Sequence, residues 1–254
     1  MHSNSIVEEF TRQSAAFNVS LVYRSAETLA SLLDLVPADT QQRWLEVCCG
    51  PGIISRSLAP RVAEMHGVDL TPAMVDLAAA EARREGLSNA TFSVGDAANL
   101  PLSDAAFDGA VTRFSIHHIP APERCVAEMA RVVRPGGWVV LGDHLTSDDL
   151  EIYAWHQELE RLRDPSHWAS LSAPRLRTLG EAVGLTLSSE KIIRFSLDFD
   201  EWLTRGTGGL QNARLIEQLL ARRPDGDPVF RVATDSSGRR SLHLIYWLAL
   251  WRRQ

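Results

Sequence analysis

The stretch 44–52, WLEVCCGPG, combines a single acid among apolar residues with a turn of two glycines and a proline. The apolar residues around Glu46 predict a short buried strand, and the turn Gly50-Pro51-Gly52 leads into a helix pattern over 53–59. Because Gly50 and Gly52 have no Cβ, a ligand can lie against the backbone, where the free N–H groups of the helix start face it. We therefore expect a ligand site at this strand–turn–helix junction.

The carboxylate of Glu46 indicates the charge of that ligand. At the end of the strand it would repel a pyrophosphate and attract an ammonium or sulfonium group. The dinucleotide fingerprint also requires a third glycine three residues after Gly52, where this chain has Ser55. A cationic nucleoside is thus the favoured ligand. An NAD-type oxidoreductase is the weaker alternative. The missing third glycine and the acid Asp96 both oppose it.

The stretch 46–52 resembles motif I of the class I S-adenosylmethionine-dependent methyltransferases, in particular the type-11 group that includes ubiquinone and menaquinone C-methyltransferases. The resemblance covers about 10–184. Cys48 departs from the family, which usually has glycine or another small residue at that position. Further matches follow in family order: GVDLTPAM at 67–74, GDA at 95–97, FD at 107–108 and RPGG at 134–137.

The resemblance implies S-adenosylmethionine as the cofactor. Asp69 would accept hydrogen bonds from the ribose hydroxyls, each worth roughly 1.5–3 kcal/mol, and Asp96 would accept one from the adenine amino group. Alternatively, Asp69 is a turn aspartate that caps the next helix, and Asp96 is an acid on a surface loop. The expected cofactor-binding residues are Gln13, Glu46, Cys48, Gly50, Gly52, Asp69, Leu70, Met74, Gly95, Asp96, Ala97, Arg113 and Phe114.

The adjacent histidines His117 and His118 are the candidates for acid–base chemistry. They follow the strand predicted over 106–114, at the carboxyl end where ligands of open α/β sheets bind. We expect His117 to orient or deprotonate the acceptor and His118 to pack against the scaffold. Alternatively, no base is needed, because in-line positioning of a nucleophilic acceptor supplies much of the acceleration.

Four further residues are candidates for binding the acceptor: His144, Trp155, His167 and Trp168. The histidines 117, 118, 144 and 167 show no fixed ligand spacing, so we expect no metal. The adjacent Cys48 and Cys49 would point to opposite faces of a strand and are expected to be reduced thiols without a catalytic role.

The 254 residues have a net charge of -6 and are 45% hydrophobic. An acidic chain lacks the attraction that dominates nucleic-acid binding, so a small-molecule acceptor is expected instead. There is no apolar run of the roughly 18 residues that span a membrane and no signal-peptide core, so the expected location is cytoplasmic. A homodimer is compatible with the sequence.

The pattern of elements predicts an α/β fold: a Rossmann-like, seven-stranded, mostly parallel sheet with an antiparallel edge strand over 242–251, helices on both faces and a lid. Residues 1–254 would form one domain, with a cofactor-binding core at 36–144 and lid or acceptor segments at 1–35, 145–172 and 196–227. The apolar positions of 5–35 predict a helix. The resemblance implies that this segment is a lid over the cofactor, and an amphipathic helix packed on the core is the alternative. Strands are expected at 45–48, 64–69, 92–94, 106–114, 138–143, 185–195, 229–233 and 242–251.

The expected activity is methylation of a small molecule by S-adenosylmethionine. The resemblance favours C-methylation of a quinone-, enol- or phenol-like metabolite over O- or N-methylation. A protein of the same fold that binds the cofactor without transferring its methyl group, as a cyclase or a binding subunit, is the alternative.

Overall fold

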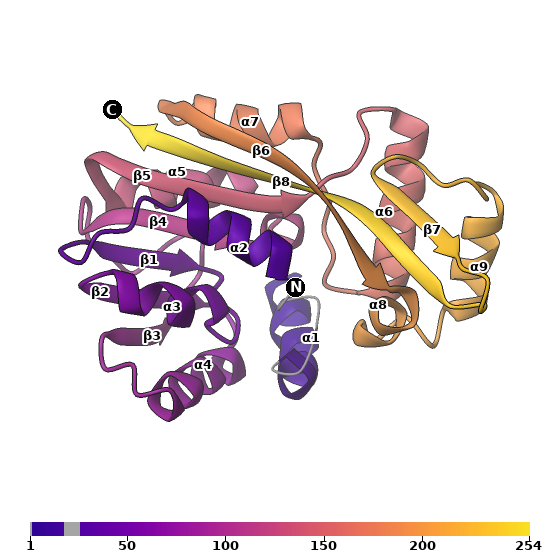
Figure 1. Cartoon of the computed structure of the whole chain (residues 1–254), viewed down its shortest axis with the longest axis horizontal. Coiled ribbons are helices and arrows are strands. Elements are labelled where there is room, and N and C mark those ends of the chain that lie inside the picture. The colour runs from indigo at the N-terminus through magenta and orange to yellow at the C-terminus, as the bar shows by residue number, and fades with distance from the viewer. Residues whose placement is uncertain (1, 18–25) are drawn as a thin grey trace.

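The computed structural model describes residues 2–17 and 26–254, which form an α/β structure around one twisted sheet (Figure 1). In these residues the sheet has eight strands in the order β3-β2-β1-β4-β5-β8-β6, and β7 also pairs with β8. The predicted Rossmann-like fold class is therefore confirmed, and all eight predicted strands join one sheet, for which seven strands were expected. The strands are β1 Arg43–Val47, β2 Glu64–Asp69, β3 Ala90–Val94, β4 Phe107–Arg113, β5 Val133–His144, β6 Leu185–Asp198, β7 Phe230–Thr234 and β8 Arg240–Arg253.

The first five strands are parallel, and the strand order reverses beside β1, which pairs with β2 on one side and β4 on the other. The crossover helices are α3 Ile53–Leu58, α4 Pro72–Arg84 and α5 Pro122–Val132. Parallel strands that leave β1 in both directions create a crevice at their carboxyl ends. The fold therefore places the ends of β1, β2 and β4 around one site.

The antiparallel strand β8 lies inside the sheet, which corrects its predicted place at the edge. One side of β8 pairs with β5 and β7, and the other pairs with β6 along nearly its whole length. Residues 244–251 of β8 are all buried. A continuous apolar run is typical of a strand covered on both faces, whereas exposed edges usually carry charge or proline.

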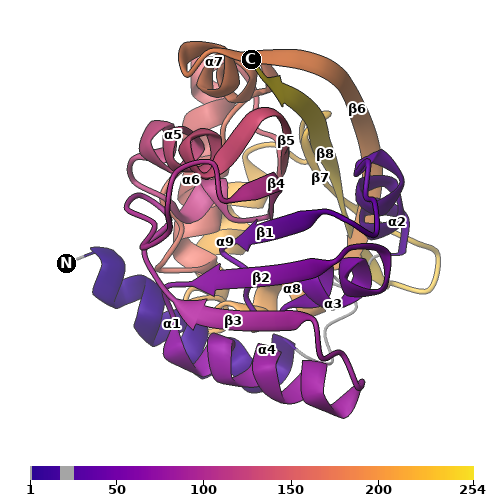
Figure 2. The same ribbon diagram turned by 90° about the vertical axis from the view of Figure 1, so that its left-hand side faces the viewer.

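The helices cover both faces of the sheet, as Figure 2 shows. Along β1, Trp44 packs with α2 (Ala26–Leu35) and α3, while the next residue, Leu45, packs with α5 and α7 (Ala173–Ala182). This alternation follows from the two-residue period of a strand. The two faces therefore have separate apolar cores.

Beyond the carboxyl ends of the strands, a group of elements forms the far side of the molecule (Figure 1). It contains α6 Leu150–Arg163, α8 Phe199–Arg205, α9 Ala213–Ala221 and β7, and the extended strands β6 and β8 reach into it. Glycines at 206, 208 and 209 separate α8 from α9. Residues 134–137, where a proline and two glycines favour a turn, are instead part of β5, because Val133 already pairs with Phe107 of β4 across a register shift.

The N-terminal segment predicted as one helical stretch over 5–35 contains α1 His2–Phe17 and α2, and positions 18–25 lie outside the described residues. Across the helices that are described, none is both long and apolar enough to cross a bilayer.

Candidate active site

Two adjoining cavities lie at the carboxyl ends of the parallel strands. The larger has a volume of about 280 Å³ and the smaller about 40 Å³, and both Phe114 and His118 line each of them. We call them the large cavity and the small cavity. The large cavity brings together most of the predicted cofactor-binding residues: Glu46, Cys48, Gly50, Asp69, Leu70, Met74, Asp96, Ala97, Arg113 and Phe114.

Three of the predicted cofactor-binding residues do not line the large cavity. Gln13 lines the small cavity, and its Nε2 donates to Glu9 Oε1 at 2.6 Å. Gly52 and Gly95 contribute through the backbone: a Cβ at Gly52 would lie 2.8 Å from Phe92 Cε1, and Gly52 has a φ of 72°. Only glycine allows this tight turn and close approach.

Asp69 connects the glycine turn to the end of β2. Its Oδ2 accepts a hydrogen bond from Gly50 N and its Oδ1 accepts one from Thr71 N, both at 2.8 Å. Burial raises the pKa of Asp69, against the effect of these backbone donors. Each carboxylate oxygen has a second lone pair for a ligand. Asp69 can therefore hold the turn and accept ligand hydroxyls at the same time.

Glu46 is a buried carboxylate on the wall of the large cavity. Its Oε2 accepts hydrogen bonds from Ser55 N at 2.7 Å and Ser55 Oγ at 2.5 Å, at the start of α3. Burial raises the pKa of Glu46 to about 7, although Ser55 lowers it. A cationic ligand would favour the ionised form. The large cavity, with the carboxylates of Glu46, Asp69 and Asp96 beside Leu70, Met74 and Ala97, thus fits a cationic nucleoside such as S-adenosylmethionine.

Two residues at the ends of adjacent strands have left-handed backbones. Cys48 after β1 has a φ of 56° and Phe114 after β4 has a φ of 53°. This conformation costs a non-glycine residue of order 1–3 kcal/mol and is concentrated at functional sites. It also explains why a methyltransferase motif favours glycine at the Cys48 position. The Arg113 guanidinium lies 4.6 Å from the Phe114 ring centre and donates to Thr28 Oγ1.

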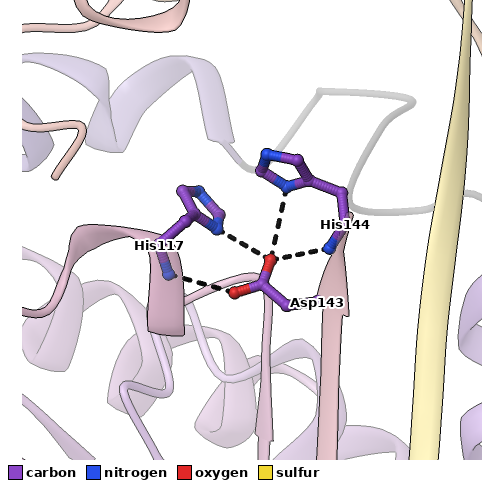
Figure 3. Close-up of side chains that lie close together, drawn as sticks. All are labelled: His117, Asp143 and His144. Atoms are coloured by element: carbon purple, nitrogen blue, oxygen red, sulfur yellow. Dashed lines mark hydrogen bonds and ion pairs between the residues drawn. The ribbon is translucent and has the colours of Figure 1, made fainter. Parts of the chain in front are cut away.

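His117 is held by the carboxylate of Asp143, the penultimate residue of β5, which pairs with β4 (Figure 3). The distance from His117 Nδ1 to Asp143 Oδ1 is 2.7 Å, and His117 N donates to Oδ2. The same Oδ1 accepts a hydrogen bond from His144 N. Burial alone would raise the pKa of Asp143, but His117 and His144 lower it below its usual range. Burial lowers the pKa of His117.

The sequence suggested that His118 packs against the scaffold. In the structure His118 lines both cavities, whereas His117 lines the small one. Its Nδ1 lies 3.1 Å from both the carbonyl oxygen and Oγ of Ser166. A carbonyl can only accept, so Nδ1 carries the proton and Nε2 has the lone pair. The ring of Phe10 contacts His118 edge-on at 4.9 Å.

Of the predicted acceptor residues, only His144 lines the small cavity. His167 is buried nearby, with Nε2 2.7 Å from Gln157 Oε1 and its ring centre 5.7 Å from that of His117. Trp155 lies in the core, where Nε1 donates to Leu219 O, and Trp168 lies 44% exposed against His2. Both tryptophans are outside the two cavities.

The sequence prediction missed several polar residues of the small cavity. Glu160, Arg163 and Asp164 all line it, and Asp143 orients His117. Asp143 could have been found, because it ends a strand beside the predicted site at the same sheet edge. The other three come from α6 and the turn after it, which no local pattern connects to the sheet.

The methyltransferase domain family matches residues 45–141. The uncharacterized methyltransferase YcgJ of Bacillus subtilis is 27% identical to this chain over 231 residues, which is 91% of each chain. The crystal structure of YcgJ superposes on this structure with a TM-score of 0.82, over 90% of this chain and 99% of YcgJ. The uncharacterized protein YafE of Escherichia coli is 30% identical over 147 residues, 58% of this chain and 71% of YafE.

A more distant fold relative, the geranyl diphosphate C-methyltransferase of Streptomyces coelicolor, was crystallised with S-adenosyl-L-homocysteine. It is 13% identical, with a TM-score of 0.64 over 91% of this chain and 79% of that one. The family match, the relatives and the donor set of the large cavity agree. This chain belongs to the class I methyltransferases of the type-11 family, and it is an enzyme whose cofactor is S-adenosylmethionine.

Proposed function

We propose that the enzyme methylates a compact enol- or phenol-like acceptor in the small cavity, with His117 as the base. The cofactor supplies an electrophilic methyl group on a sulfonium. The observation that supports the proposal is the short contact between His117 Nδ1 and Asp143. Because a carboxylate can only accept, Nδ1 carries the proton and Nε2 offers its lone pair to an acceptor.

The large cavity supports the proposed cofactor-binding roles. Asp69, at the end of β2, would accept the ribose hydroxyls, and Asp96 with Ala97, after β3, would hold the adenine. Glu46 would face the positive charge of the methionine portion. Phe114 and His118 stand where the cavities meet, so the methyl group would pass between them.

An acceptor with an acidic O–H matches a neutral imidazole. His117 Nε2 would take the hydroxyl proton, and the electron pair left on the acceptor would form the new bond to the methyl group through carbon or oxygen. The methyl–sulfur bond would break at the same time, and its electron pair would stay on the sulfur. C-methylation of an enol, phenol or quinone precursor is the form that we favour. The rings of Phe195 and Trp202 supply an apolar wall for such an acceptor, and a volume of about 40 Å³ favours a compact one.

The test is a screen of enols, phenols, quinone precursors and amines with S-adenosylmethionine carrying a ¹³C-labelled methyl group. NMR of the products identifies the methylated atom. A labelled enol or phenol product is the expected result. Labelling only of amines would contradict the proposed acceptor class. Cofactor binding with no labelled product from any class would favour the cyclase or binding-subunit alternative.

A further inference from the structure

A second group of ligating side chains lies beside the small cavity, which two of its members, His144 and Glu160, line. His144, His156 and Glu160 are all buried, and their ligating atoms, one from each residue, lie within 4.8 Å of one another. We propose that these three residues bind a divalent transition-metal ion of the zinc type. Two imidazoles and one carboxylate form a ligand set that zinc favours in proteins.

The elements bring these residues together without a long sequence motif. His156 and Glu160 are four residues apart on α6, so they share one face of the helix. His144 is the last residue of β5 and faces that helix. Counting spacings among histidines alone misses this set, because one ligand is a glutamate.

An unpartnered nitrogen points to a ligand at this place. His156 is fully buried, and its Nε2 makes no hydrogen bond in the described structure. It lies 3.9 Å from Glu160 Oε1, too far for a direct hydrogen bond and far enough for an atom to bridge the two groups. A buried polar nitrogen without a partner costs free energy, which a bound cation would recover.

The surrounding groups already orient the proposed ligands. His156 Nδ1 lies 3.1 Å from Thr146 Oγ1, and His144 Nδ1 lies 3.3 Å from Asp143 Oδ1. Such outer contacts on the far nitrogen are typical of metal-binding histidines. Arg163 binds Glu160 Oε2, so Oε1 is the oxygen nearer to His156. Trp202 Nε1 makes only a long contact of 3.4 Å with that Oε1. Ser170 Oγ lies 2.9 Å from His144 Nε2, and this hydrogen bond would have to break for Nε2 to bind the metal.

The inference does not depend on the proposed acceptor, and its test needs no activity. Untagged protein is stripped with a chelating resin and titrated with Co²⁺, whose visible absorption reports nitrogen and oxygen ligation, and Zn²⁺ is then added in competition. We expect one equivalent per chain. Affinity should fall at least about tenfold in His156→Gln and Glu160→Gln, since even outer contacts of a metal site contribute that much.

His243→Gln is the matched control, because this histidine contacts Ser196 and Ser241 on β6 and β8, away from the cavity. It should bind like the wild type. No saturable binding, or equal binding in all variants, would overturn the proposal. If a variant does not fold by circular dichroism, anomalous diffraction at the zinc edge from wild-type crystals decides: a peak between His144, His156 and Glu160 supports the site, and its absence there contradicts it.

Discussion

Asp69 is the residue on which the proposed cofactor geometry depends most. Asp69→Ala should weaken S-adenosylmethionine binding by roughly tenfold or more, because charge-assisted hydrogen bonds to the ribose would be lost. The same change removes the acceptor for Gly50 N and Thr71 N, so Asp69→Asn is the matched variant that keeps one amide oxygen for the turn. Calorimetric titration measures both. An unchanged dissociation constant in both folded variants would mean that the ribose lies elsewhere.

Glu46 should make cofactor affinity depend on pH. Its pKa is raised to about 7 by burial, so the carboxylate is largely protonated at about pH 6 and largely ionised at about pH 7.5. A positive ligand prefers the ionised form, so affinity should increase across this range, below the pH of about 8 at which a free α-amino group loses its charge. Glu46→Gln should flatten the profile. A pH-independent dissociation constant in the wild type would contradict this role.

Cys48 tests the backbone conformation at the end of β1. Cys48→Gly should be tolerated, because glycine adopts a φ of 56° without strain. Cys48→Val should have a free energy of unfolding about 1–2 kcal/mol lower than that of Cys48→Gly, since a Cβ in this region lies too close to the following carbonyl and a branched one is the most crowded. Urea denaturation measures both changes. Equal stability of the two variants would show that the backbone relaxes out of the left-handed region.

At the scale of elements, the sequence was most informative where local chemistry decides the structure. Pro72 begins α4, as is typical of proline at the first helical position, and the glycine turn follows β1, as predicted. Prediction failed at β8: its apolar run indicates a buried strand, but only the pairing with the long strand β6 shows that it lies inside the sheet. Local patterns also could not show that Val133 pairs with β4 and extends β5 through the Pro-Gly turn.

The N-terminal helix α1 contributes lining residues to both cavities. Ser3, Ile6 and Phe10 line the large cavity and Gln13 lines the small one. Its buried Glu9 accepts hydrogen bonds from Thr207 N at 2.9 Å and from Thr207 Oγ1, between α8 and α9. These contacts favour the lid interpretation of this helix.

Removal of this connection should free the helix. Glu9→Ala should cost about 2 kcal/mol of local stability and speed both hydrogen exchange in α1 and dissociation of S-adenosylmethionine, because hydrogen bonds to a buried charge are lost. Glu8→Ala, at an exposed position on the same helix, is the control. Exchange mass spectrometry and stopped-flow fluorescence provide the two measurements. Identical behaviour of the two variants would show that α1 is not a lid.

At the scale of the whole molecule, the two cavities belong to parts of the chain that differ in how well sequence predicts them. The large cavity is formed by the ends of strands and the turns that follow them, so short motifs identify most of its residues. The small cavity is lined by residues of α1, β5, α6, β6, α8 and β8 and of the segment after β4. Its His117, Glu160 and Phe195 lie far apart in the sequence and are brought together only by the fold. Its chemistry could therefore be predicted only at His117, His118 and His144.

We infer that methyl transfer takes place where the two cavities meet, with His117 acting on the acceptor and not on the cofactor. Single-turnover kinetics with saturating S-adenosylmethionine and the acceptor found in the screen test this most directly. His117→Gln should slow the transfer step by about 10²–10⁴-fold while the cofactor dissociation constant stays at the wild-type value. An unchanged transfer rate in His117→Gln would contradict the role of His117 as the base and show that positioning alone drives the reaction.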